Sequence, residues 1–302
     1  MSNISLLLPT RGRKALLERL FDSLYQTTSD LSRVEVVLCV DDDDTETLDM
    51  GFDPVFHVRK VVGPRTTMGA YNTKCLENAS GNIVILFNDD IVVRTSGWDQ
   101  AIIDFDARHE DKIYLAYVND LFKKKKVGSF PVLSRKACDV LADPFPAPYK
   151  GEHIDYHLFD IFKRLSMKGY DRTHYFENVV FEHMHFSQGK ASFDQTYLDR
   201  KMYEDDGVFV AYAPVRRNAA DRLAAAIRGN SLPERTESPR LLPTGPDREY
   251  IRTLYSTFVR DRRLPFWWRW KLFLWFSWRS FAKRGKFLWV KKIVKSARKQ
   301  WA

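Results

Sequence analysis

The 302-residue sequence contains few cysteines and no long hydrophobic run. Its three cysteines, Cys39, Cys75 and Cys138, are widely spaced and include no CxxC pair, so we expect buried thiols in a reducing compartment rather than a disulfide framework. The longest uncharged run in the aromatic C-terminal segment, Leu272–Trp278, is far shorter than the roughly 20 apolar residues that cross a bilayer. We therefore expect no transmembrane helix.

An export signal is also missing, because the N-terminal Met-Ser-Asn runs directly into an apolar segment without a charged stretch before it. A cytoplasmic protein is therefore expected. No internal repeat is evident, and a hydrophobic content of 44% is enough to build one full core. One main domain followed by a tail is the expected organisation.

Positive charge is in excess and is concentrated at one end of the chain. The formal net charge is +9 and the pI is near 9.3, which favours an anionic partner such as nucleic acid, anionic lipid or a phosphorylated substrate. No acidic residue follows Asp261, so the excess is a local property of the C-terminal segment.

Apolar runs alternate with helical patterns along the first part of the chain. The predicted strands cover residues 4–8, 34–40, 58–62 and 83–87. The predicted helices include residues 11–26, 68–79, 98–108 and 154–167. Strands and helices that alternate at this spacing indicate an α/β fold, with a mostly parallel sheet flanked by helices.

The sequence also predicts three regions along the chain. The main α/β domain covers residues 1–228, and residues 229–247 are rich in proline and polar residues, as is typical of a linker. Residues 248–302 form a helical segment rich in basic and aromatic side chains.

Acidic side chains gather where two predicted strands end. Asp41–Asp44 follow the second strand, and Asn88–Asp90 follow the fourth. In open α/β sheets ligands bind at this edge, and a divalent cation held there by carboxylates neutralises a nucleotide diphosphate. An ordinary solvated loop is the alternative for Asp43 and Asp44.

Three segments then carry a resemblance to a known family: residues 6–13 (LLLPTRGR), 38–42 (LCVDD) and 81–90 (GNIVILFNDD). In this order and spacing they resemble the N-terminal signatures of family 2-like GT-A glycosyltransferases. The resemblance covers roughly residues 1–215. It implies a GT-A (Rossmann-like) catalytic domain that binds a nucleotide-diphosphate sugar, UDP-linked or another.

By this resemblance, several residues would contact the nucleotide-sugar. They are Pro9, Thr10, Arg11, Asp41 or Asp42, Met68, Asn72, Asn88 and Asp89. Asn88–Asp90 would take the place of the family's DxD motif, and Asp90 would bind Mn²⁺ or Mg²⁺. The family usually has an acid where this chain has Asn88, so the chain departs from the family pattern at this position.

A catalytic base is expected in the segment Gly151–Tyr156. An inverting transfer needs a base beside the acceptor hydroxyl, opposite the departing nucleotide. The family resemblance places that base in this region, and Asp155 is our choice, with Glu152 second. The alternative is that either acid only caps the helix that begins here and complements its dipole.

A second group of metal ligands is predicted at His183 and His185. Residues i and i+2 lie on the same side of an extended strand, so both imidazoles can face one site. GT-A enzymes often place a histidine late in the domain as an additional metal ligand, and this segment resembles that element. For each histidine, the alternative is a hydrogen-bonded structural residue.

The segment 264–302 combines tryptophan with lysine and arginine, which is typical of a helix lying at an anionic membrane surface. A helix packed on the catalytic domain or on a partner is one alternative. Nucleic-acid binding is another, but the acids at the sheet edge would repel a phosphate backbone, so no nucleic acid is expected.

Together these patterns predict a metal-dependent inverting glycosyltransferase. It would move a sugar from a nucleotide-diphosphate donor to a hydroxyl of a glycan or lipid-linked acceptor, in cell-surface polysaccharide synthesis, on the cytoplasmic face of a membrane. The alternatives are an inert membrane-binding subunit with the same fold and a nucleotidyltransferase. The second would need a Gly-rich basic phosphate loop, of which residues 9–13 are a faint version.

Overall fold

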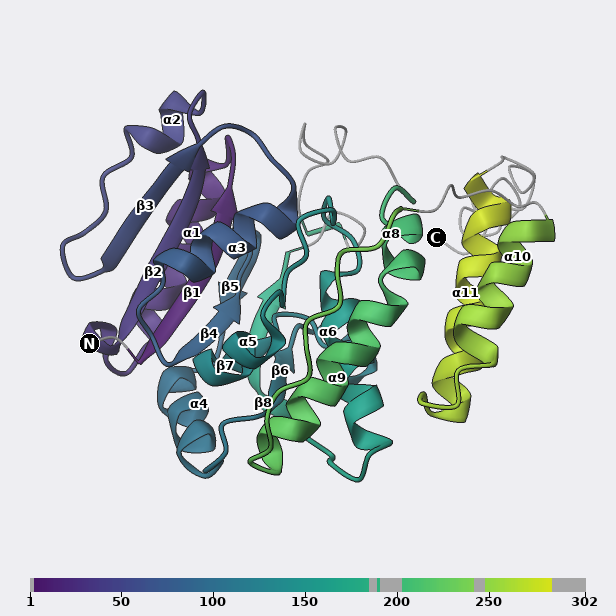
Figure 1. The fold of residues 1–302 in the computed structure, drawn as a ribbon. Coiled ribbons are helices and arrows are strands. Elements are labelled where there is room, and N and C mark those ends of the chain that lie inside the picture. The colour runs from purple at the N-terminus through teal and green to yellow at the C-terminus, as the bar shows by residue number, and fades with distance from the viewer. Residues whose placement is uncertain (1–2, 185–188, 191–202, 242–247, 284–302) are drawn as a thin grey trace, which may run out of the picture.

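The computed structural model describes residues 3–184, 189–190, 203–241 and 248–283, and these form a mixed α/β structure around one sheet of eight strands (Figure 1). The strands are β1 (Ile4–Thr10), β2 (Val34–Asp41), β3 (His57–Gly63), β4 (Ile83–Leu86), β5 (Ile91–Val93), β6 (Leu115–Asn119), β7 (Val132–Ser134) and β8 (Thr173–His183).

Helices surround this sheet on both faces. In the first part of the chain they are α1 (Lys14–Thr27), α2 (Thr45–Leu48), α3 (Met68–Asn78), α4 (Trp98–Ala107), α5 (Arg135–Leu141) and α6 (Ile154–Ser166), with the short η1 (Leu31–Arg33) and η2 (Lys124–Lys126). Later come α8 (Asp206–Ala211), α9 (Ala213–Ile227), α10 (Arg248–Leu254), the π-helical turn η4 (Tyr255–Val259) and α11 (Phe266–Lys283).

The strand order is β3-β2-β1-β4-β7-β6-β8-β5. The first four neighbours in this order are parallel to one another, and β6 is parallel to β8. Strand β7 runs antiparallel to β4 and β6, and β5 runs antiparallel to β8. The predicted mostly parallel α/β sheet is confirmed.

The continuous apolar runs in the central strands arise because both faces of the sheet are covered. In β1, Leu7 packs into one core cluster together with α6 and α9, whereas Leu6 and Leu8 pack into a second cluster together with α1 and α4. All three side chains are fully buried. The sequence therefore shows no alternation of apolar and polar residues here, since neither face of the strand meets water.

Close backbone approach fixes the start of α3 against the loop before α6. The backbone N–H of Gly69 donates to the carbonyl of Tyr149 at 2.9 Å. A β-carbon at Gly69 would lie 2.1 Å from the carbonyl oxygen of Pro146, which leaves room only for glycine. This contact sets α3 beside the segment that leads to the predicted base.

The C-terminal helices lie at the end of the molecule farthest from β3 (Figure 1). One face of α11, with Trp268, Leu272 and Phe276, is buried in the same core cluster as Phe209 of α8. The rings of Phe209 and Phe276 stack with centroids 5.1 Å apart. The aromatic segment thus packs on the α/β domain along one side, and the predicted division at residues 229–247 stays a prediction.

A buried ionic network joins α6, α9 and α11. The carboxylate of Asp160 accepts hydrogen bonds from Arg164 Nε (2.9 Å), Arg216 Nε (2.7 Å) and Trp268 Nε1 (2.8 Å). Arg164 also donates to Asp261 at 2.6 Å. Burial alone would raise the pKa of Asp160, but the two guanidinium groups and the indole N–H hold it at about 2.

Two expectations about the chain as a whole can be compared with the described residues. Cys39, Cys75 and Cys138 are all buried and free, as predicted. Within the part of the chain that the structure covers, no helix is both long enough and apolar enough to cross a bilayer.

Candidate active site

The carboxyl ends of β1, β2 and β4 bring the predicted donor-site residues to one edge of the sheet. At the end of β1, Thr10 donates its hydroxyl to Asp89 Oδ2 at 2.8 Å, and Arg13 Nη1 donates to Asp89 Oδ1 at 2.7 Å. Burial raises the pKa of Asp89, Arg13 opposes this, and the neighbouring Asp90 adds to it. Through these two hydrogen bonds, Asp89 holds the loop after β1 against the loop after β4.

A second carboxylate, Asp41 at the end of β2, has one partner on each oxygen. Arg11 Nη1 donates to Asp41 Oδ2 at 2.7 Å, and the hydroxyl of Tyr71 on α3 donates to Asp41 Oδ1. Arg11 also forms a two-pronged pair with the exposed Asp43, and these contacts hold its pKa above the ordinary value. Arg11 is about one-third exposed, so its guanidinium faces solvent beside the sheet edge.

Other predicted donor-site residues lie close by with different surroundings. Asp42 and Asn88 are exposed, and Pro9 is buried within β1. Met68 begins α3, and the buried Asn72 donates from Nδ2 to the Met68 carbonyl at 3.0 Å. Asn72 thus stabilises the first turn of α3, while Asp42 and Asn88 present their side chains to solvent.

The predicted metal ligands Asp90 and His183 meet at this edge. His183 Nε2 lies 3.2 Å from Asp90 Oδ2, and the backbone N–H of Met184 donates to the Asp90 carbonyl at 2.8 Å. Two ligands at right angles around an octahedral ion, each about 2.1 Å from it, would lie about 3.0 Å apart. The pair therefore fits adjacent positions around a small divalent cation. His185 lies outside the described residues.

The predicted base Asp155 lies in the first turn of α6 and is partly exposed. Lys123 Nζ lies 3.3 Å from Asp155 Oδ2, and the backbone N–H of Tyr156 donates to Oδ1 at 2.8 Å. Burial would raise the pKa of Asp155, but Lys123, the Tyr156 N–H and His153 outweigh it, so the pKa lies below its ordinary value. Asp155 is therefore ionised at neutral pH, as a base must be.

The second candidate base, Glu152, has a different environment. Its Oε2 accepts a hydrogen bond from Arg279 Nη2 of α11 at 2.7 Å and another from the backbone N–H of Tyr203 at 3.2 Å. The same arginine donates from Nε to Asp206 Oδ1 at 2.8 Å. Glu152 is therefore tied to the C-terminal helix, which leaves Asp155 as the better placed acid.

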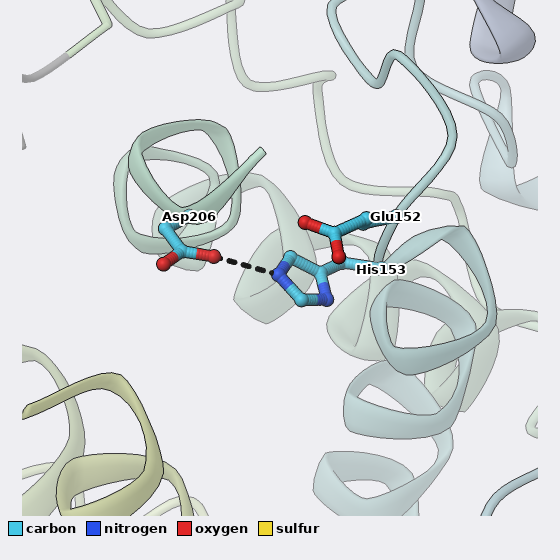
Figure 2. A group of neighbouring side chains, drawn as sticks. All are labelled: Glu152, His153 and Asp206. Atoms are coloured by element: carbon cyan, nitrogen blue, oxygen red, sulfur yellow. Dashed lines mark hydrogen bonds and ion pairs between the residues drawn. The ribbon is translucent and has the colours of Figure 1, made fainter. Parts of the chain in front are cut away.

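Glu152, His153 and Asp206 bring three possible metal-ligand atoms within 4.8 Å of one another. Figure 2 shows the ring of His153 between the two carboxylates, with Nε2 hydrogen-bonded to Asp206 Oδ1 at 2.9 Å. The guanidinium of Arg279 already forms ion pairs with both carboxylates. A metal ion would have to displace it, so we assign this cluster to anchoring α11.

One loop connects the candidate metal ligands with the candidate base. The backbone N–H of His183 donates to the carbonyl of Asp120 at 3.2 Å, and Lys123, three residues later, reaches Asp155. Asp90, His183 and Asp155 therefore surround one region at the carboxyl end of the sheet. Neither Asp120 nor Lys123 was predicted from the sequence as a site residue.

Two further contacts in the site were not predicted from the sequence. Tyr71 lies between Met68 and Asn72, which were expected to contact the nucleotide-sugar, but its bond to Asp41 spans 30 residues. Arg13 lies within the first signature, yet its partner Asp89 is 76 residues away. A hydroxyl or guanidinium at these positions has no local signature, because only the sheet topology creates the contact.

Solved structures with the same fold can now be compared. TarS from S. aureus, in complex with UDP-GlcNAc, matches with a TM-score of 0.52 and 12% sequence identity, covering 94% of this chain and 92% of that chain. The fold is of the GT-A type. The resemblance predicted from the three sequence segments is confirmed at the level of the fold.

Two more solved structures match at lower TM-scores. Mannosyltransferase PcManGT from Pyrobaculum calidifontis, in complex with GDP-Man and Mn²⁺, has a TM-score of 0.46 and 15% identity over 99% of this chain and 81% of that chain. Glucosyl-3-phosphoglycerate synthase from Mycobacterium tuberculosis has a TM-score of 0.45 and 17% identity over 76% of this chain and 81% of that chain. The sequence matches no protein-family profile and no curated protein sequence.

Proposed function

We propose that this protein is a metal-dependent inverting glycosyltransferase that uses a nucleotide-diphosphate sugar. The observation that carries the proposal is the meeting of Asp90 with His183, 3.2 Å apart, at the ligand-binding edge of a GT-A-type sheet. The solved structures of this fold include complexes with UDP-GlcNAc and with GDP-Man and Mn²⁺, which supports a donor of the same class. The acceptor is a hydroxyl on a glycan or a lipid-linked molecule.

In this proposal Asp90 and His183 hold the divalent cation, which when bound neutralises the diphosphate leaving group. One carboxylate oxygen and one imidazole nitrogen favour Mn²⁺, since Mg²⁺ takes oxygen ligands. Arg11 and Asp41 face the nucleoside, and Tyr71 fixes the Asp41 carboxylate from the side of α3. These groups bind and orient the donor.

Asp155 takes the proton of the acceptor hydroxyl as its oxygen attacks the anomeric carbon. The bond from that carbon to the diphosphate oxygen breaks on the opposite side, and the nucleoside diphosphate leaves with the bonding electrons. Attack and departure in line invert the configuration at the anomeric carbon. The ionised state of Asp155, maintained by Lys123, supports this role.

Replacing Asp90 with alanine is expected to abolish metal-dependent nucleotide binding. Calorimetric titration with UDP, GDP and CDP, with and without Mn²⁺, should identify one nucleotide that binds the unaltered protein only with the metal. The variant should bind that nucleotide at least about 100-fold more weakly, because loss of even an outer partner of a metal ligand costs about 10- to 100-fold. His183→Ala should give a loss in the same range.

Asp171→Ala is the matched control, since Asp171 is an exposed carboxylate just before β8, at the opposite end of that strand from His183. It should bind nucleotide as the unaltered protein does. A folded protein that binds none of the three nucleotides would contradict the proposed function and favour an inert subunit with this fold.

We further propose that α11 lies on an anionic membrane surface. Five of its exposed side chains recur every three or four residues, so they form a single stripe along the helix opposite its buried face. The stripe consists of Trp267, Lys271, Leu274, Trp278 and Phe281. Trp267 is 81% exposed, and the seven basic residues that follow Lys283 in the sequence add attraction for anionic lipid.

Replacing Trp267, Leu274 and Trp278 together with serine is expected to release the protein from vesicles. Partitioning onto vesicles of phosphatidylcholine and phosphatidylserine, measured by sedimentation, should fall by at least about 100-fold, because a large apolar side chain contributes about 1.5–3 kcal/mol when fully buried and three such side chains exceed this loss even when each is only partly buried. The variant should stay folded, because the buried face of α11 is unchanged.

The matched control replaces three exposed apolar residues elsewhere, Tyr25, Val55 and Leu232, with serine. Vesicle binding by this control should equal that of the unaltered protein. Equal binding by the α11 variant as well, or no preference of the unaltered protein for anionic over neutral vesicles, would show that α11 does not face a membrane.

A further inference from the structure

A short basic loop beside the candidate active site has a composition that the donor chemistry does not require. Residues 120–126, here called the lysine loop, read Asp-Leu-Phe-Lys-Lys-Lys-Lys. Leu121 and Phe122 are 39% and 40% exposed, and the three lysines of η2 that follow are exposed as well. The loop thus presents an apolar pair directly beside a concentrated positive charge.

The lysine loop is held in one conformation. The buried carboxylate of Asp120 accepts backbone hydrogen bonds from Phe122 (2.9 Å), Lys123 (2.8 Å) and Lys124 (2.7 Å). Leu121 and Lys124 adopt φ angles of 55° and 51°, which side-chain-bearing residues rarely adopt without such support. The backbone of the loop at Phe122, Lys123 and Lys124 is therefore fixed relative to Asp120.

This loop lies between the candidate metal ligand and the candidate base. The ring of Phe122 lies with its centroid 6.4 Å from that of His183, and Lys123 pairs with Asp155 at 3.3 Å. A group bound at the exposed side of the loop would therefore lie next to the place where donor and acceptor meet.

The charge of the loop lacks a counterpart in the described residues. Among those residues, Lys124, Lys125 and Lys126 have no acidic partner within ion-pair distance. Three adjacent like charges repel one another, and a multivalent anion would relieve that repulsion. A nucleotide-sugar has no hydrocarbon chain to cover Leu121 and Phe122, whereas a lipid phosphate offers one beside its anionic group.

The helix proposed to face the membrane, α11, packs against the first turn of α6. Tyr156, the residue after Asp155, stacks on Trp275 of α11 with centroids 4.7 Å apart. The first turn of α6 therefore contacts both the lysine loop and the helix whose outer stripe is proposed to meet lipid. An acceptor anchored in a membrane under α11 would have its head group close to the loop.

We propose that the lysine loop binds the phosphate or diphosphate group of a lipid-linked acceptor, with Leu121 and Phe122 against the start of its hydrocarbon chain. This inference rests on the proposed function and narrows its acceptor to a phosphorylated lipid. Lys123 then lies between the acceptor's anion and Asp155, and it can hold the acceptor beside the base.

The test compares the full chain on two kinds of vesicle with equal surface charge, one containing phosphatidic acid and the other phosphatidylserine. Phosphatidic acid presents a phosphomonoester and serves as the probe. The unaltered protein should bind the phosphatidic acid vesicles at least about fivefold more tightly, the effect of one further lysine contact. Changing Lys124, Lys125 and Lys126 to glutamine should bring that ratio close to one.

The matched control changes three exposed basic residues elsewhere, Arg59, Arg108 and Lys136, to glutamine and should keep the ratio. Circular dichroism confirms that both variants are folded. A ratio near one for the unaltered protein, or a preference that survives in the lysine-loop variant, would overturn the inference.

Two further measurements distinguish a soluble phosphate ligand from a lipid, and failure of this inference from failure of the proposed function. Free pyrophosphate with EDTA tests for a soluble ligand: loop-dependent binding of pyrophosphate without any vesicle preference would make the ligand a soluble phosphate and the lipid assignment wrong. Metal-dependent binding of UDP, GDP or CDP by the unaltered protein is measured in parallel. Its absence would contradict the proposed function, whereas its presence together with a vesicle ratio near one would contradict only the lysine-loop inference.

Discussion

Replacing Asp155 with asparagine is expected to lower kcat for sugar transfer by about 10²- to 10⁴-fold, the usual contribution of a positioned general base. Asparagine keeps the size of the side chain but cannot take up the proton of the acceptor hydroxyl. Donor affinity should change little, because Asp155 lies on α6 and the donor residues lie at the ends of β1, β2 and β4. Initial rates with saturating donor, together with nucleotide titration, separate the two effects.

Glu152→Gln is the competing variant, and it should keep most of the rate. Its carboxylate is held by Arg279, so its loss should loosen α11 rather than remove a base. If Glu152→Gln abolished transfer while Asp155→Asn retained it, the base would have to be reassigned to Glu152.

The pH dependence offers an independent check on Asp155. Its lowered pKa means that the base form persists to low pH, so the acidic limb of the rate profile should lie below the ordinary pKa of 3.8. Lys123→Gln removes the charge that lowers this pKa, and the limb should move to higher pH. An acidic limb that does not respond to Lys123 would point to another group as the base.

Much of the sheet could be predicted from the sequence because the central strands are buried on both faces. The runs 4–8, 34–40 and 83–87 are almost wholly apolar, and the structure places β1, β2 and β4 there. Strands β5 and β7 were not predicted. Each has only three residues, and each pairs in antiparallel fashion with strands that are distant in sequence.

Within the candidate site, single residues could be predicted from the sequence, but contacts between residues distant in sequence could not. Asp41 and Asp90 directly follow apolar strands, and this position indicated a binding site. Burying a carboxylate without a hydrogen-bond or metal partner costs free energy. The pair between Glu152 and Arg279 spans 127 residues, and no local pattern could indicate it. The same limit applied to α11, since composition predicted an aromatic helix but could not divide its apolar residues between a buried and an exposed face.

Replacing Asp160 with asparagine is expected to destabilise the protein by about 3–5 kcal/mol, because removing one partner of a buried ionic network leaves an uncompensated charge. Two aspartates and two arginines balance in the network formed by Asp160, Asp261, Arg164 and Arg216. The variant leaves one positive charge in excess among fully buried side chains. Urea unfolding followed by circular dichroism measures the loss.

Two control variants show whether the charge itself is responsible. Asp221→Asn removes a partly exposed carboxylate that pairs with Lys168 at 2.6 Å, and it should cost no more than about 1 kcal/mol. The double variant Asp160→Asn with Arg216→Met restores neutrality and should recover part of the lost stability. If it were no more stable than Asp160→Asn alone, packing rather than charge would be the cause.

The same network predicts how stability depends on pH. A folded pKa of about 2 against an ordinary value of 3.8 means that Asp160 contributes its full stabilisation above pH 3.8 and loses it as the pH falls towards about 2. The difference in unfolding free energy between the unaltered protein and Asp160→Asn should therefore shrink across this window. Because Trp268 donates to the same carboxylate, protonation should also loosen α11 from α6, so limited proteolysis should cut the C-terminal helices first. A difference that stays constant over this range would show that the ionisation of Asp160 does not couple α11 to the α/β domain.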